Sequence, residues 1–106
     1  MSTVLEEIGR LRAISSDLRS KRFDHKAILA LLRSMLAALA RYLPNAELKE
    51  GKNKWVCNFG IKGVALIMVE PVHGSRDAIP QYWRTQMLDT VDEVLDLVES
   101  VVEGKS

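Results

Sequence analysis

Apolar residues recur at every third or fourth position along three stretches of the chain, and this spacing places them on one face of an α-helix. The first stretch predicts a helix from Thr3 to about Ser20. Its apolar face is formed by Val4, Ile8, Leu11, Ile14 and Leu18. Thr3 and Glu6 have the spacing of a capping box, in which each side chain accepts a hydrogen bond from the other residue's backbone amide. The sequence therefore marks the start of this helix clearly.

The second stretch predicts a helix from Asp24 to about Tyr42, which Pro44 ends. One broad face holds its large apolar residues, Ile28, Leu31, Leu32, Met35, Leu36, Leu39 and Leu43. A neighbouring side holds small residues that let another helix approach closely, namely Ala27, Ala30, Ser34, Ala37 and Ala38. A helix with apolar residues over so much of its circumference needs cover on two sides. Either the first helix or a second copy of the chain supplies the second cover.

Between residues 46 and 69 the pattern changes to one typical of β-strands. Residues 46–50 form a polar strand, and residues 55–61 alternate between apolar and more polar or small positions, with Trp55, Cys57, Phe59 and Ile61 in phase. Residues 64–69 are continuously apolar, which favours a central strand. Pro71 marks the end of the predicted sheet region.

The last stretch predicts a helix from near Asp77 to about Glu103, with Pro80 in its first turn. Its apolar stripe consists of Ile79, Trp83, Met87, Val91, Val94, Val98 and Val101. The opposite face is acidic and contains Asp89, Asp92, Asp96, Glu99 and Glu103. We expect this acidic face to be solvated or, alternatively, to dock the basic turn of another copy.

The element order α-α-β-β-β-α predicts an α+β fold, with a three-stranded antiparallel sheet and helices packed on one face. Residues 1–106 are expected to form one domain, made of a helical hairpin (3–43), a sheet (46–69) and a C-terminal helix (77–103). The hydrophobic fraction of 47% and the charged fraction of 27% are those of an ordinary globular protein. Because so short a chain buries a modest share of its surface, oligomerisation would add stability.

The single cysteine, Cys57, excludes an intramolecular disulfide and a four-cysteine zinc site. The two histidines are far apart in the sequence, so we expect no metal site and no cofactor. The first residues contain acids and no apolar block, unlike a signal peptide. The longest apolar run, 27–43, is interrupted by charges and is too short to span a bilayer. We therefore expect a cytoplasmic protein that does not enter a membrane.

Charge is divided unevenly between the two halves of the chain. Residues 1–54 contain eleven Lys or Arg and six Asp or Glu, whereas residues 55–106 contain four and eight. A basic cluster at the first interhelical turn is a candidate site for nucleic acid or another anion, and consists of Arg19, Lys21, Arg22 and Lys26.

The loop Glu70–Asp77 holds the other candidate side chains, His73, Ser75 and Arg76. It precedes a helix start, where free amides favour an anion, and His73 has the chemistry of an acid or base near neutral pH. The sequence contains neither a Gly-x-Ser-x-Gly motif nor a phosphate-loop motif, and no catalytic residue is assigned.

These observations favour a non-enzymatic protein-interaction module. It would form a homodimer, or bind a protein partner, through the first helix and the small side of the second. The alternatives are nucleic-acid binding by the basic turn and a small-ligand or enzymatic site in the loop 70–77.

Overall fold

The computed structural model describes residues 3–22, 25–51, 54–69 and 81–104. Within them the elements follow one another as α1 (Val4–Arg19), α2 (His25–Ala38), β1 (Glu47–Glu50), β2 (Lys54–Asn58), β3 (Ala65–Val69) and α3 (Gln81–Val102). This mixture of helices and antiparallel strands confirms the α+β class predicted from the sequence.

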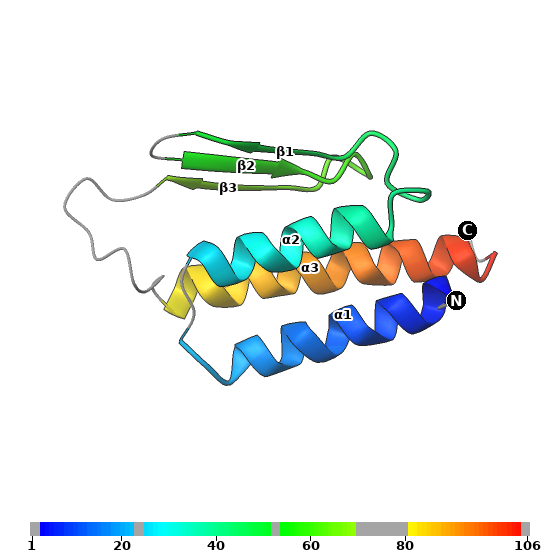
Figure 1. The fold of residues 1–106 in the computed structure, drawn as a ribbon, viewed down its shortest axis with the longest axis horizontal. Coiled ribbons are helices and arrows are strands. Elements are labelled where there is room, and N and C mark those ends of the chain that lie inside the picture. Colours follow the sequence, from blue (N-terminus) through cyan, green and yellow to red (C-terminus); the bar gives the residue numbers. More distant parts are fainter. Residues whose placement is uncertain (1–2, 23–24, 52–53, 70–80, 105–106) are drawn as a thin grey trace.

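The elements form layers (Figure 1). The sheet lies over one side of α2 and α3, and α1 lies on the opposite side of these two helices. α2 packs beneath β1 and α3 beneath β3, while α1 packs against α3 and α2. Because α3 has the sheet on one side and α1 on the other, it needs a wider buried face than an ordinary surface helix.

The core follows from this arrangement. Its members come from all layers and include Ile8 and Leu11 of α1, Ile28, Leu32 and Met35 of α2, and Trp55 and Cys57 of β2. α3 contributes Met87, Leu88, Val91, Val94, Leu95 and Val98. Leu88 and Leu95 lie outside the predicted stripe, because α3 is covered on two sides. The ends of that stripe were predicted wrongly, since Trp83 and Val101 are exposed.

The start of α1 is as predicted. The Glu6 amide donates to Thr3 Oγ1 over 3.1 Å, and the Thr3 amide donates to Glu6 Oε1 over 3.4 Å. These reciprocal bonds satisfy two amides that the helix itself leaves without partners.

The predicted end of the second helix is too late. α2 ends at Ala38, and the Tyr42 amide donates to the Leu39 carbonyl, which is the spacing of a turn rather than an α-helix. Leu39 and Leu43 are nevertheless buried in the core. The apolar periodicity therefore continues past the last helical residue, and that is why the sequence overestimates the helix.

The sheet has the order β1-β2-β3, with both pairs antiparallel. The prediction that residues 64–69 form the central strand is wrong, because β2 lies between its two neighbours in sequence. Short connections favour the pairing of consecutive antiparallel strands, so the middle strand of the sequence becomes the middle strand of the sheet. β3 is an edge strand despite its apolar sequence.

The turn between β2 and β3 explains why the predicted strand 55–61 ends earlier, at Asn58. Asn58 Oδ1 accepts a hydrogen bond from the Gly60 amide over 2.9 Å. Gly60 has φ 65°, and a Cβ there would lie 2.8 Å from the backbone of Asn45. A glycine is therefore required both by the backbone conformation and by the close approach of a neighbouring segment.

Candidate interaction surface

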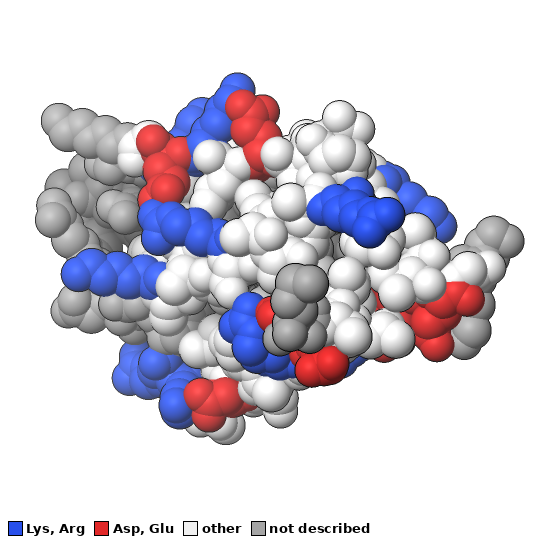
Figure 2. Space-filling model, turned by 45° about the vertical axis from the view of Figure 1, so that its right-hand side comes forward, with Lys and Arg blue, Asp and Glu red and all other residues white. Residues whose placement is uncertain are grey.

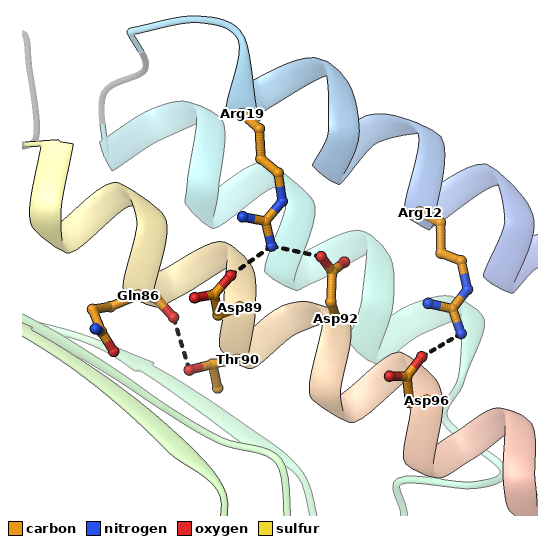
Figure 3. Close-up of polar contacts among 7 residues, drawn as sticks. All are labelled: Arg12, Arg19, Gln86, Asp89, Thr90, Asp92 and Asp96. Atoms are coloured by element: carbon orange, nitrogen blue, oxygen red, sulfur yellow. Dashed lines mark hydrogen bonds and ion pairs between the residues drawn. The ribbon is translucent and has the colours of Figure 1, made fainter.

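Two arginines of α1 hold this helix against α3 (Figure 3). Arg12 donates to Asp96 over 2.7 Å. Arg19 donates to Asp89 over 2.8 Å and to Asp92 over 2.7 Å. Figure 3 shows both side chains reaching from α1 toward the carboxylates of α3. We refer to these five residues as the arginine clamp.

The spacing of the arginine clamp is matched on the two helices. Arg12 and Arg19 are seven residues apart, as are Asp89 and Asp96. Seven residues make about two helical turns, so each set lies on one face of its helix. Since the later residue of α1 pairs with the earlier residue of α3, the helices are antiparallel. The acidic face predicted to be solvated thus bears the partners of α1.

The electrostatics of the arginine clamp favour the charged forms. Hydrogen bonds to Asp92 and Asp89 raise the pKa of Arg19. Partial burial acts to lower the pKa of Arg12, but the hydrogen bond and charge of Asp96 outweigh it, so this pKa is also raised. Both arginines therefore remain cationic and committed to carboxylates of the same chain.

The structure does not bring the basic cluster of the first turn together as a free patch. Arg19 is in the arginine clamp, and Lys21 donates to Asp17 over 2.7 Å. Arg22 and Lys26 are exposed. On the face shown in Figure 2, basic and acidic side chains lie next to one another in several places and form no continuous basic area. The pairing of Arg19 and Lys21 with carboxylates of the same chain does not favour a phosphate-binding surface at the first turn.

The small side of α2 is only partly covered. Ala30 and Ala37 are exposed, whereas Ala27 and Ala38 pack partly against the core. Ser34 Oγ accepts a hydrogen bond from Arg10 of α1 over 3.1 Å. The first helix of the same chain thus reaches this side at Ser34, while Ala30 and Ala37 stay exposed.

The loop Glu70–Asp77, with His73, Ser75 and Arg76, lies outside the described residues. In the described part of the chain, no three His, Cys, Asp or Glu side chains are placed to hold a metal ion. Within the same residues, no helix is both long and apolar enough to cross a membrane.

Cys57 lies in the core, in phase with Trp55 and Phe59 as expected, and burial raises the pKa of its thiol to about 11. The protonated thiol is a weak nucleophile. His25, in the first turn of α2, accepts a hydrogen bond at Nδ1 from Trp55 Nε1 over 3.1 Å. Both side chains therefore have structural roles.

A pocket of about 130 Å³ lies between the end of α1 and the start of α3, and is lined by Leu18, Arg19, Gln81, Arg84, Thr85 and Leu88. Pockets that bind small ligands commonly enclose roughly 300–1,000 Å³. Arg19 at its rim is already paired with Asp89 and Asp92. This pocket therefore suits neither a cofactor nor a substrate of ordinary size.

Two large apolar side chains that are adjacent in the sequence are exposed in the first turn of α3. Tyr82 is 66% exposed and Trp83 is 49% exposed. Their ring centroids are 5.5 Å apart and the ring planes meet at 80°, the edge-to-face geometry preferred by aromatic pairs. We refer to these two residues as the aromatic pair. Sequence reasoning missed it, because it placed Trp83 in the buried stripe and overlooked Tyr82.

The second candidate contact feature, after the aromatic pair, is the outer edge of β3. Among the strands that the structure describes, β3 has a hydrogen-bonded neighbour on one side only. α3 packs beneath it, and the aromatic pair and the Val69 end of β3 lie toward the same end of the molecule (Figure 1). The end of β3 and the first turn of α3, which carries the aromatic pair, therefore lie toward one end of the molecule.

Comparisons with protein-family models, with curated proteins and with solved structures find no match for this chain.

Proposed function

We propose that this protein is a non-enzymatic interaction module that self-associates, and that the aromatic pair is part of its contact surface. The observation that carries the proposal is the exposure of Tyr82 and Trp83 at the start of a helix whose following turns are buried. Tyrosine and tryptophan are the residue types most enriched at the centres of protein interfaces.

The geometry of the aromatic pair suits binding. A fully buried Tyr or Trp covers on the order of 150–250 Å², and 66% of Tyr82 and 49% of Trp83 are exposed here. The edge-to-face contact holds the two rings against one another before a partner arrives, so fewer side-chain rotations are lost on association. Both rings project from α3, a helix fixed between the sheet and α1. The surface is therefore aromatic and is presented by a helix that packs against both the sheet and α1.

The proposed surface differs from the one that sequence patterns favour. α1 is bound to its own chain through the arginine clamp, so it is not available to a partner without breaking those ion pairs. The exposed alanines of α2 add little apolar area. Nucleic-acid binding by the first turn has less support, because Arg19 and Lys21 already pair with carboxylates of this chain.

The test compares masses in solution by light scattering at micromolar concentration. The unmodified chain is expected at about twice its own mass of 11.9 kDa. The variant with Tyr82→Ser and Trp83→Ser is expected to be monomeric, because it loses both rings without disturbing a buried residue.

A matched control removes two other exposed apolar side chains, by Leu5→Ser and Val101→Ser. These residues are 46% and 55% exposed and lie at the opposite end of the α1–α3 pair. The control variant is expected to keep the mass of the unmodified chain. A monomeric unmodified chain, or a control that dissociates as fully as the aromatic variant, would refute the proposed surface.

A further inference from the structure

We infer that the partner is a second copy of this chain, whose β3 pairs antiparallel with β3 of the first across the open edge, so that one continuous sheet runs through both copies. This inference rests on the proposed self-association and adds the backbone seam that would hold it. It follows from the hydrogen-bonding phase of β3, from the charges on the two edges, and from the position of α3.

The hydrogen-bonding phase of β3 is fixed by the turn that precedes it. The Phe59 amide donates to the Val64 carbonyl over 3.1 Å, so these two residues form a hydrogen-bonded pair. Hydrogen-bonded and non-hydrogen-bonded pairs alternate along an antiparallel ladder. In the register Cys57↔Leu66 and Trp55↔Met68, the backbone groups of Leu66 and Met68 therefore point toward β2.

The backbone groups of β3 that do not point toward β2 lie at the open edge. By the same alternation, the amides and carbonyls of Ala65, Ile67 and Val69 point away from β2. These three residues are symmetric about Ile67. A twofold axis at Ile67 pairs that residue with itself in the second copy, and pairs Ala65 with Val69 in both directions. Every outward-pointing group of the strand then finds a partner, as an isologous interface requires.

The two edges of the sheet differ in charge. β1, at the other edge, reads Glu-Leu-Lys-Glu, and Glu47, Lys49 and Glu50 are all exposed. Charged side chains on an edge strand are a common device against edge-to-edge pairing. β3 reads Ala-Leu-Ile-Met-Val and has no charge and no proline. Two copies of β3 therefore meet without opposing like charges, whereas two copies of β1 do not.

The position of α3 makes the second copy a better occupant of this edge than an isolated peptide strand. α3 packs beneath β3 and carries Tyr82 and Trp83 in its first turn. A partner that adds only a strand leaves these rings exposed. A second copy brings its own α3 beneath the shared sheet, with the first turns of the two α3 helices toward opposite ends of the strand seam.

The test is residue-resolved amide hydrogen exchange on the full chain, measured by NMR at protein concentrations above and below the dissociation constant of the dimer. Above it, the amides of Ala65, Ile67 and Val69 are expected to exchange about tenfold or more slowly than below it, because pairing closes the edge. Leu66 and Met68 donate within the monomer and serve as internal controls that stay protected at both concentrations.

The outcomes separate this inference from the proposal on which it rests. If the chain dimerises while the three outward amides keep their monomer exchange rates, the strand seam is wrong and self-association stands. A chain that stays monomeric at every concentration refutes both. The variant Tyr82→Ser with Trp83→Ser, if monomeric, supplies the reference rates for the open edge.

Discussion

At the scale of single residues, the structure separates side chains with similar sequence signals. Cys57 and Trp83 both occupy apolar positions of a regular pattern, yet one is fully buried and the other half exposed. Periodicity gives the direction in which a side chain points along its element. It does not show whether another element packs against that side chain. The buried core was therefore largely predicted, whereas the exposure of the aromatic pair was not.

Ser15 is the buried residue whose replacement should stabilise the fold. It is 1% exposed on α1, and its hydroxyl has no hydrogen-bond partner among the described residues. Ser15→Ala removes an unpaired buried hydroxyl and improves helix propensity, so the free energy of unfolding is expected to rise by about 0.5–1.5 kcal/mol.

The neighbouring Ser16 is exposed, and Ser16→Ala provides the control for helix propensity alone. Denaturant titration of both variants isolates the effect of burial. Equal changes in the two variants would mean that the Ser15 hydroxyl is satisfied in solution.

Cys57 predicts an alkaline limit to stability. Because burial raises the pKa of its thiol to about 11, from an ordinary value of 9.0, the folded chain holds this proton at a pH where the unfolded chain releases it. Stability is therefore unaffected below about pH 9 and falls as the pH rises from about 9 to 11. The fall should be smaller in Cys57→Ala, measured by urea unfolding across this range. Identical pH profiles for the two chains would contradict a buried, protonated thiol.

At the scale of elements, local signals predicted most of the secondary structure. The capping box of Thr3 and Glu6 marks the start of α1, and it needs only residues three apart. The arginine clamp joins residues separated by 70 to 84 positions, and no periodicity within either helix reveals it. The sequence therefore predicted a solvated acidic face on α3, because it does not show that α1 packs antiparallel against this face.

The arginine clamp should contribute measurably to the docking of α1. In a double-mutant cycle of Arg19→Ala and Asp92→Ala, we expect a coupling free energy of about 0.5–1 kcal/mol, because both side chains are partly exposed and screened by solvent. The pair Lys21–Asp17, exposed and within one helix, is the matched control and should couple by about 0.3–0.5 kcal/mol. A coupling no larger than that of the control would show that the Arg19–Asp92 pair adds no more to stability than an ion pair within one helix.

At the scale of the whole molecule, the layered arrangement leaves the two sheet edges chemically unlike. The edge formed by β1 carries charges, and the edge formed by β3 does not. The sequence predicted an apolar strand at 64–69, but its continuous apolar character suggested a central position. The order of the strands in the sheet depends on their connections rather than on their composition. The sequence therefore does not show that β3 lies at an edge.

The dissociation of two copies in solution tests the account most directly. Sedimentation equilibrium of the unmodified chain should give an average mass that rises with concentration toward about twice 11.9 kDa. A mass that stays at that of one chain over the whole micromolar range would contradict self-association through α3 and the edge of β3.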